Sequence, residues 1–387
     1  MQKRPQAMNL SNWRQSPYSQ WSFHHVREVI PSEIIAAGKG ATAGWKRAER
    51  SFDNIKFRGA KGDPWSLQQL FQATSTDALL VAHQGKLVHE WYAREDIANQ
   101  PHIVFSVSKS ITAALAGVLV GQGLLDPGAA VTHYLPELGN SAYADCSVQQ
   151  VLDMTVCVEF DELYDAKDGK FVEYRVSTGW HPAELHQIDF CLHDFLISLS
   201  RGPGSHGEVF DYKSPNSDLL GWILESIAQQ RLADLFSKYL WQPMGAEADA
   251  YITVDRKGAA RTAGGFCAIP RDLLKFGELM RNAGCVGDQQ IIPAHWVQEC
   301  REGGDHEVWR RGGSTTEKFP NGSYRNKWYQ TGNTHGAFCA IGIHSQWIYI
   351  DPVAEVVIVK LSSQDEPLNF ELGQANLRAF EAICAAS

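Results

Sequence analysis

Ser106 and Lys109 stand three residues apart at the start of a long apolar stretch, and residues of these types at this spacing can carry nucleophilic chemistry. Residues at i and i+3 share one face of a helix with their Cβ atoms roughly 5–6 Å apart, so the Lys109 amine can reach the Ser106 hydroxyl. A serine hydroxyl is a weak nucleophile until a neighbouring base takes its proton. Lysine is such a base only where burial lowers its pKa, and the apolar residues after Lys109 predict such an environment.

A Ser-x-x-Lys spacing also arises by chance, because both residue types are common. The position of the pair favours the catalytic interpretation, since unpaired N–H groups and the positive dipole at a helix N-terminus favour negative charge near Ser106. A proton relay is also needed, and Tyr212 stands in a short polar segment before another expected helix. Tyr212 is either an ordinary packing tyrosine or a phenol held next to Lys109, and spacing alone does not decide between them.

The elements that must position these residues follow from local patterns. The helix that begins near Ser106 is expected to end at residues 121–123, where glycine can adopt the left-handed capping conformation. Alternating or continuous apolar runs predict strands at 77–83, 86–92, 250–254, 337–343, 346–350 and 355–360. Capping and periodicity predict helices at 147–154, 189–199, 215–229, 231–239, 271–282 and 369–383. Residues 158–187 lack a period and predict a long loop, a feature that often forms a lid.

Strands at both ends of the chain and helices between them predict an α+β fold, with an antiparallel sheet flanked by helices and an all-α lobe inserted between the sheet-forming ends. We expect three parts. Residues 1–72 form an irregular N-terminal arm packed on the body, residues 73–110 and 246–387 form the sheet domain, and residues 111–245 form the mostly helical insertion.

Composition excludes several classes of protein. The formal net charge of −9 argues against a general affinity for nucleic acid or an anionic membrane. The chain has no run of 18 apolar residues and no signal-peptide pattern, so we expect a cytoplasmic protein without a membrane span. The eight cysteines are scattered and predict free thiols, with no metal site. The chain also lacks the Gly-x-Ser-x-Gly motif of α/β-hydrolases.

Taken together, several segments resemble the serine penicillin-recognising superfamily of β-lactamases, D-alanyl peptidases and related esterases. Within it they look closest to the 6-aminohexanoate-dimer hydrolases and family VIII-type carboxylesterases. The resemblance implies a β-lactamase/transpeptidase-like fold. The segments that carry it, in order, are Phe105–Ser110, Val151–Met154, Tyr212–Asn216, Ile252–Asp255, Arg271–Leu273, Phe319–Tyr324, Thr331–Asn333, Ile341–His344 and Val359–Ser363.

The resemblance implies a role for each reacting group. Ser106 would be the nucleophile, Lys109 its base, and Tyr212 the relay that protonates the leaving amine or alkoxide. The N–H groups of Ser106 and Ile343 would form the oxyanion hole. The reaction would be hydrolysis of an ester or amide bond in a small molecule through an acyl-Ser106 intermediate, with no cofactor or metal. The alternative is a β-lactamase or a D-alanyl-peptidase-like penicillin-interactive protein.

The resemblance also implies substrate contacts by Tyr164, Arg175, Trp180, Ser214, Ala263, Tyr329, Gly342 and His344. The aromatic members of this set have core packing as their alternative role. β-Lactamases and peptidases carry a cation where this chain has Ala340, and efficient oligomer hydrolases have an acidic residue and a histidine where it has Arg175 and Ala263. Arg175 offers no partner to a substrate ammonium. We therefore expect esterase activity on short acyl esters. We also expect a monomer or a homodimer.

Overall fold

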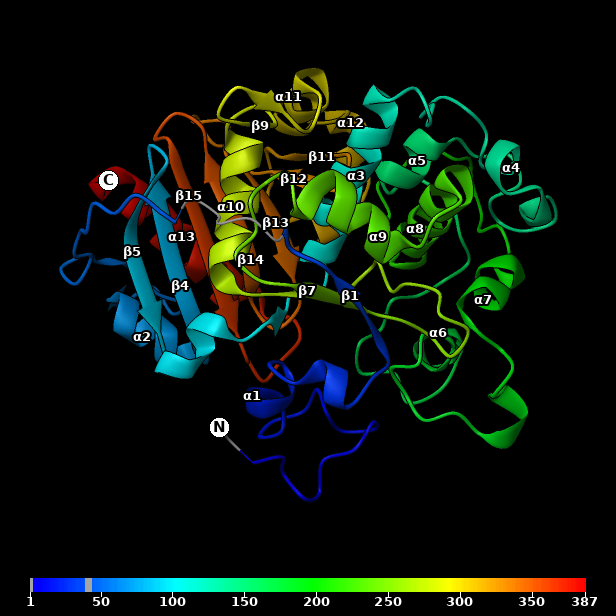
Figure 1. The fold of residues 1–387 in the computed structure, drawn as a ribbon, viewed down its shortest axis with the longest axis horizontal. Helices are drawn as coiled ribbons and strands as arrows, with labels where there is room; N and C mark the ends of the chain where they lie inside the picture. Colours follow the sequence, from blue (N-terminus) through cyan, green and yellow to red (C-terminus); the bar gives the residue numbers. More distant parts are fainter. Residues whose placement is uncertain (1–2, 39–43) are drawn as a thin grey trace.

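The computed structural model describes residues 3–38 and 44–387; residues 1, 2 and 39–43 of the expected arm lie outside the described residues. A layer of strands with helices on its faces lies beside a group of helices (Figure 1). This arrangement confirms the predicted α+β class with antiparallel sheets. The division of the chain into three parts stays a prediction.

The main sheet has seven antiparallel strands in the order β11-β12-β13-β14-β15-β4-β5. The bounds of its strands are β11 (Ser323–Arg325), β12 (Trp328–Gln330), β13 (Phe338–Gly342), β14 (Gln346–Asp351), β15 (Val356–Ser362), β4 (Thr76–His83) and β5 (Lys86–Tyr92). The pairing of β15 with β4 joins the C-terminal strands to the first hairpin. The middle of β4, residues 78–82, is apolar because both faces of the sheet are covered: Leu80 packs in one core and Leu79 in the other.

Helices cover both faces of this sheet. In Figure 1, α10 (Pro270–Arg281) crosses in front of the sheet, while α13 (Phe370–Ala386) lies behind it and α2 (Leu67–Ala73) packs on β4. On α13, the Phe380 ring lies 5.6 Å from that of Trp347 and 5.4 Å from that of Tyr349 on β14. On the α10 side, a Cβ at Gly277 would lie only 2.4 Å from Val357, so a glycine is needed where the helix meets the sheet.

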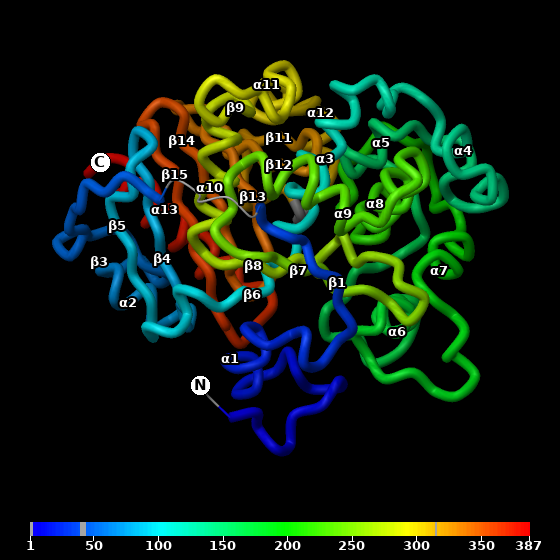
Figure 2. The backbone as a smooth tube through the Cα atoms, viewed as in Figure 1, coloured from blue at the N-terminus to red at the C-terminus, as the bar shows by residue number. Residues whose placement is uncertain are grey.

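A second sheet has the order β1-β7-β8-β6, with β1 (Ser32–Ile35), β7 (Ala250–Thr253), β8 (Phe266–Ala268) and β6 (His102–Ile103) (Figure 2). Two short hairpins pair β2 (Phe57–Arg58) with β3 (Pro64–Trp65) and β9 (Cys285–Val286) with β10 (Gln289–Gln290). The expected irregular arm, residues 1–72, is thus not irregular throughout, because it contains β1, β2, β3 and most of α2, whose N-terminus carries a capping box. The partner of β1 lies more than 200 residues away, so local patterns did not reveal this pairing.

Helix α3 (Val107–Gly121) lies between the main sheet and the helical lobe, in contact with β13 and β14 on one side and α8 on the other. It is buried along nearly its whole length, which explains its apolar sequence. The other helices of the lobe are α4 (Val131–Tyr134), α5 (Val148–Leu152), α6 (Lys170–Ser177), α7 (Leu192–Ser198), α8 (Pro215–Ala228) and α9 (Leu232–Phe236).

The expectation of a continuous loop at residues 158–187 is wrong, because α6 and a 3-10 turn, Leu185–Gln187, lie within it. Helix α6 is only eight residues long, and its apolar contacts through Phe171 and Tyr174 are too few to produce a visible period. The short helices α1 (Ser19–Ser22), α11 (Ala294–Glu302) and α12 (His306–Arg310) were not predicted either.

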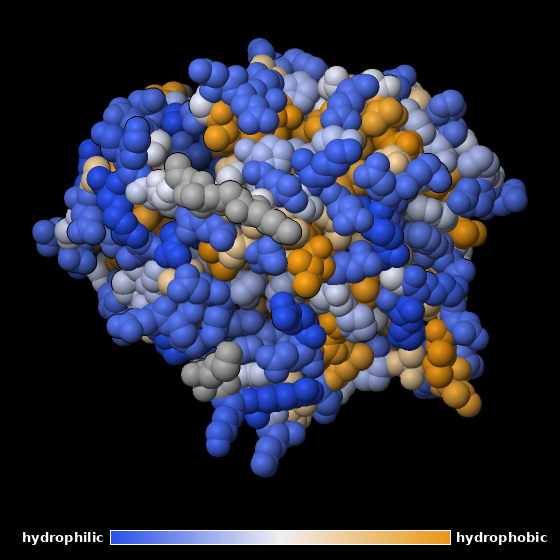
Figure 3. Space-filling view, in the orientation of Figure 1, coloured by the Kyte–Doolittle hydropathy of each residue, from blue (hydrophilic) through white to orange (hydrophobic). Residues whose placement is uncertain are grey.

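On the face shown in Figure 3, hydrophilic side chains predominate and hydrophobic ones form separate patches. One patch lies over the segment between α6 and α7, where Leu185 and Ile188 are exposed. None of the described helices has the length and apolarity needed to span a membrane. All eight cysteines are free thiols, as predicted; six are buried, while Cys157 and Cys285 are partly exposed.

Candidate active site

Ser106 immediately precedes α3, and Lys109 lies one turn further along the same helix face. The Lys109 Nζ atom lies 2.9 Å from Ser106 Oγ and donates a hydrogen bond to the Ala263 carbonyl oxygen, at 2.7 Å. Lys109 is only 1% exposed. Burial lowers the pKa of its amine to about 8, although the nearby charge of Glu162 acts in the opposite direction. With a pKa of about 8, roughly a tenth of Lys109 is uncharged at pH 7 and able to accept a proton, and this fraction grows as the pH rises.

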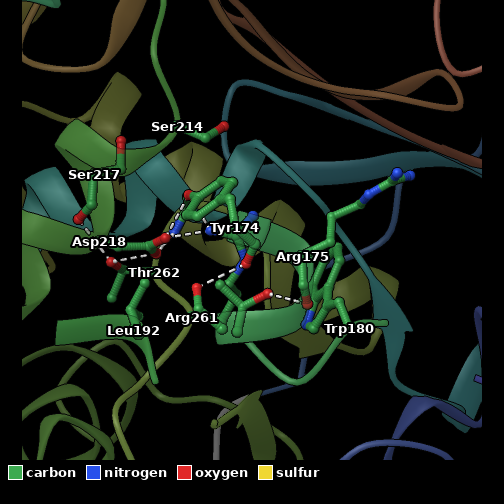
Figure 4. Close-up of polar contacts among 12 residues, drawn as sticks. Tyr174, Arg175, Trp180, Leu192, Ser214, Ser217, Asp218, Arg261 and Thr262 are labelled. Atoms are coloured by element: carbon green, nitrogen blue, oxygen red, sulfur yellow. Dashed lines mark hydrogen bonds and ion pairs between the residues drawn. The ribbon is translucent and has the colours of Figure 1, made fainter. Parts of the chain in front are cut away.

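The buried ion pair between Asp218 and Arg261 (Figure 4) helps to fix the position of the Ala263 peptide. Asp218, on α8, forms an ion pair with Arg261 and accepts a hydrogen bond of 2.5 Å from the Tyr174 hydroxyl. The same carboxylate accepts the Ala263 N–H at 2.7 Å. Because Ala263 then offers its carbonyl oxygen to Lys109, this network orients the amine towards Ser106.

The residue before Ser106 has a strained backbone. Phe105 has φ +44°, a left-handed conformation that costs a non-glycine residue about 1–3 kcal/mol and that persists only where packing enforces it. Its ring is enclosed by the rings of Trp13, Phe23, Trp180 and His344, with centroids at 6.5, 4.9, 6.0 and 5.2 Å. Trp13 and Phe23 belong to the N-terminal arm, so the arm helps to hold the peptide that presents Ser106.

Ser106 opens onto a cavity of about 370 Å³, which we call the catalytic cavity. The predicted residues that line it are Ser106, Tyr164, Tyr212, Tyr329, Gly342 and Ile343. Two other predicted residues, Arg175 and His344, line a neighbouring cavity of about 440 Å³, which we call the arginine cavity.

Three predicted contact residues line neither cavity. Trp180 is a core residue whose indole N–H donates to the Thr253 hydroxyl at 3.1 Å. Ser214 is buried and donates its hydroxyl to Glu162, and Ala263 acts through its carbonyl oxygen. Their positions indicate support of the site rather than direct contact with a substrate.

Two backbone N–H groups at the catalytic cavity are free. Within the described part of the chain, neither the Ser106 N–H nor the Ile343 N–H has a hydrogen-bond acceptor. Ile343 follows the end of β13, and a Cβ at Gly342 would lie 2.4 Å from the Val104 carbonyl oxygen. A glycine is therefore required for the end of β13 to approach the segment that carries Ser106. Free N–H groups beside a nucleophile are able to stabilise a developing oxyanion.

Tyr212 precedes α8 and packs over the catalytic pair. Lys109 Nζ lies 5.0 Å from the centroid of its ring, which stacks on Tyr329 at 6.3 Å. Burial and the charge of Glu162 raise the pKa of Tyr212, more than its contacts with Ser106 and Tyr329 lower it. The phenol therefore keeps its proton and can act as a donor.

Comparison with known proteins identifies the family. A model of the β-lactamase family matches residues 67–382. The chain belongs to the β-lactamase family. It is 34% identical to the 6-aminohexanoate-dimer hydrolase of Paenarthrobacter ureafaciens over 92% of this chain and 88% of that protein. A solved structure from Bacillus anthracis, assigned as a candidate 6-aminohexanoate-dimer hydrolase, matches with a TM-score of 0.90, 26% identity and coverage of 100% of this chain and 98% of that one.

More distant members share the fold. A family VIII carboxylesterase matches with a TM-score of 0.56 and 15% identity over 81% of this chain and 97% of that one. EstCE1, a hydrolase with promiscuous acyltransferase activity, matches with a TM-score of 0.64 and 16% identity over 82% of this chain and 96% of that one. These matches confirm the β-lactamase-like fold. Membership of the β-lactamase family makes the chain a hydrolase of ester or amide bonds.

The sequence did not identify Glu162, which stands out in this β-lactamase-family site. It lines the catalytic cavity, and its carboxylate accepts hydrogen bonds from the Tyr164 hydroxyl at 2.6 Å and from the Ser214 hydroxyl and N–H at 2.7 and 2.6 Å. Glu162 thus ties the segment after α5 to the one that carries Tyr212. The only feature of the sequence that could have pointed to Glu162 is its position in the stretch 158–187, which was expected to be a functional loop. Lys318 was also missed and lines the same cavity.

Three buried side chains of metal-ligand type, His24, Asp77 and His102, lie together outside both cavities. His102 Nε2 lies 3.3 Å from one Asp77 oxygen, which also accepts the Ser363 hydroxyl at 2.6 Å. The other Asp77 oxygen lies 3.7 Å from His24 Nε2. Because they come from three separate segments, their spacing in the sequence gave no sign of the cluster. It links the arm to β4 and β6.

Proposed function

We propose that the chain is a serine hydrolase that cleaves ester and linear amide bonds of small molecules through an acyl-Ser106 intermediate. The observation that carries this proposal is the 2.9 Å contact between Ser106 Oγ and a buried Lys109 amine at the edge of a cavity. The pKa of about 8 for Lys109 supports its role as the base. The family membership of the chain supports the class of reaction.

In the acylation step, Lys109 accepts the Ser106 proton as Oγ attacks the substrate carbonyl carbon. The carbonyl oxygen becomes negatively charged and is stabilised by the N–H groups of Ser106 and Ile343. Tyr212 donates its proton to the leaving nitrogen or oxygen as the carbon–heteroatom bond breaks, and it recovers a proton from Lys109. The product of this step is acyl-Ser106 and a free amine or alcohol.

In the deacylation step, water attacks the acyl carbon and its proton passes to the Tyr212–Lys109 pair, so that Ser106 Oγ leaves as a hydroxyl. The same two N–H groups stabilise the second oxyanion. The pathway needs no metal and no cofactor. Cytoplasmic location and a monomeric or dimeric state stay predictions.

Among short acyl esters, β-lactams and the 6-aminohexanoate dimer, we expect the esters to react fastest. β-Lactam hydrolysis should be poor, because Ala340 offers no cation for the penicillin carboxylate at the end of β13. Hydrolysis of the 6-aminohexanoate dimer should also be poor, because Arg175 repels an ammonium group.

A parallel assay with 4-nitrophenyl butyrate, the linear dimer of 6-aminohexanoate and a chromogenic cephalosporin tests the proposal. We expect ester turnover that disappears in Ser106→Ala, with little turnover of the other two compounds. Strong Ser106-dependent turnover of the dimer would instead identify an amidase. An absence of Ser106-dependent turnover on all three compounds would contradict the proposed function.

A further inference from the structure

The arginine cavity adjoins the catalytic cavity. Tyr164 lines both cavities, and the consecutive residues Ile343 and His344 line one each. A substrate bonded to Ser106 therefore has a second space of about 440 Å³ within reach past Tyr164. The function of this space depends on the groups that line it.

One of these groups is Arg175, on α6, which is only 8% exposed. Its Nη2 donates to the Ala166 carbonyl oxygen at 2.5 Å, but its Nε is buried without an acceptor among the described residues. Figure 4 shows its guanidinium pointing away from Asp218, the carboxylate that pairs with Arg261. Arg175 is thus a shielded cation with unused donor capacity, and no described carboxylate forms an ion pair with it.

The second cation is Arg14, from the N-terminal arm. Its guanidinium carbon lies 5.8 Å from the Trp13 ring and 6.0 Å from the Trp180 ring, and it forms no ion pair with a described carboxylate. Burial, followed by repulsion from Arg175 and Arg261, lowers the pKa of Arg14 to about 9, so that its guanidinium stays charged at neutral pH. The two arginines therefore repel each other in this cavity, and neither forms an ion pair with a described carboxylate.

The remaining charged groups of the arginine cavity lie at its rim. Asp165, Asp365 and Lys167 are all exposed, where solvent screens them. Burial lowers the pKa of His181, and that of His344 to about 4, so both imidazoles are neutral at pH 7. The inner part of the cavity is accordingly positive.

We propose that the arginine cavity binds a carboxylate at the far end of the acyl half of the substrate. The substrate class is then the half-esters and half-amides of dicarboxylic acids. Guanidinium groups bind carboxylates through paired, charge-assisted hydrogen bonds, and the free donors of Arg14 and Arg175 fit this geometry. This inference rests on the proposed function.

The acyl half is the part of the substrate that enters this cavity, because the leaving atom must contact Tyr212. Tyr212 lines the catalytic cavity but not the arginine cavity. An ammonium end would meet two cations here, whereas Glu162 lines the catalytic cavity and not the arginine cavity.

The test compares esters that share one leaving group. The probes are mono-4-nitrophenyl adipate and suberate, the neutral 4-nitrophenyl hexanoate and octanoate, and 4-nitrophenyl 6-aminohexanoate. The two chain lengths sample the span between the cavities, and the common nitrophenol removes any contribution of Lys318 to leaving-group binding. We expect kcat/KM for at least one anionic ester to exceed that of the neutral ester of equal length about tenfold or more, because a charge-assisted pair gives at least that factor. The aminohexanoate ester should be the slowest.

Substitutions then connect this preference to the two arginines. Arg175→Gln and Arg14→Gln should each reduce the ratio of anionic to neutral kcat/KM by about tenfold. Arg14 is less buried than Arg175 and makes no ion pair with a described carboxylate, so Arg14→Gln provides a second test if Arg175→Gln fails to fold. Arg310→Gln is the matched control, because it removes an exposed cation of α12 that lies outside both cavities, and it should leave the ratio unchanged.

Equal kcat/KM values for the anionic and neutral esters at both lengths in the wild-type protein would overturn the inference while leaving the proposed function intact. A preference for the anionic esters that survives both substitutions would overturn it as well. A complete lack of Ser106-dependent hydrolysis of all five esters would overturn the proposed function, and the inference with it.

Discussion

The catalytic cavity and the arginine cavity share Tyr164, and each has buried cations beside it or in its lining, but the two environments have opposite consequences. Burial lowers the pKa of Lys109 to about 8, so its amine readily gives up its charge. Burial also lowers the pKa of Arg14, but only to about 9, and Arg14 stays charged at neutral pH. Lys109 is thereby suited to move a proton, and the arginines are suited to hold an anion.

The difference arises from the two side-chain types and from their partners. An arginine has a higher ordinary pKa than a lysine, so Arg14 stays charged even though its pKa is lowered by more than that of Lys109. Lys109 also contacts a hydroxyl and a carbonyl oxygen, which accept hydrogen bonds without requiring a full positive charge. The role of a buried cation, as a base or as a receptor for an anion, therefore depends on its residue type and on its hydrogen-bond acceptors.

The largest expected loss of activity comes from replacing the Lys109 amine beside Ser106 with a guanidinium. Lys109→Arg should lower kcat for 4-nitrophenyl butyrate by roughly 10³-fold or more, because a guanidinium cannot accept the Ser106 proton. Steady-state kinetics and a thermal melt of the same preparation measure activity and folding together. Activity within tenfold of wild type in a folded Lys109→Arg protein would contradict the role of Lys109 as a base, which is what distinguishes it from the arginines.

The next effect concerns the proton donor. Tyr212→Phe should lower kcat/KM for an amide by about 10²-fold, and much less for a nitrophenyl ester, since nitrophenolate leaves without being protonated. The two substrates are compared on one enzyme preparation, so that a loss of active protein cancels in the ratio. Equal losses on both would contradict the role of Tyr212 as the donor to the leaving group.

The pH dependence of the reaction reports on Lys109 directly. Its pKa is lowered, so the amine is protonated and inactive at low pH, and kcat/KM should rise with pH to a plateau with a midpoint at about 8. In Glu162→Gln the midpoint should move to lower pH, because the Glu162 carboxylate raises the pKa of Lys109. Profiles of both proteins on a neutral ester measure the shift. A midpoint that stays in place or moves upward in the variant would contradict this coupling.

The smallest effect concerns the stability of the boundary between the cavities. Burial lowers the pKa of His344 to about 4, below its unfolded value of about 6.5, so its contribution to stability is present above pH 6.5 and is lost as the pH falls towards 4. The melting temperature should therefore fall by a few °C between pH 7 and 5. His344→Asn, which keeps a residue that tolerates φ +60°, should reduce this dependence. An unchanged pH dependence in the variant would show that His344 is not a source of the effect.

The elements that sequence patterns predicted well are those with strong local signals. Helix α3, the β4–β5 hairpin, strands β13 to β15 and helix α13 have long apolar or alternating runs, and each lies within a few residues of its expected bounds. Helix α6 and the short strands β11 and β12 were missed because they have too few residues to show a period.

The same reasoning applies to the site. Ser106 and Lys109 are neighbours on one helix, so their contact could be predicted from spacing alone. Trp180 lies in the core cluster under the arm, the alternative to the substrate contact that the resemblance implies, since an aromatic residue type does not distinguish a cleft from a core. The place of Arg14 in the arginine cavity could not be predicted, because it depends on how Trp13 packs against Trp180, a residue far away in the sequence.

The most direct test of the account is the detection of the covalent intermediate. The protein is mixed with 4-nitrophenyl butyrate, quenched with acid within milliseconds, and measured by intact mass and peptide mapping. We predict a burst of nitrophenol and a butyryl adduct on the peptide that contains Ser106, with neither in Ser106→Ala. Turnover that persists in Ser106→Ala, or an adduct on another residue, would contradict the assignment of Ser106 as the nucleophile.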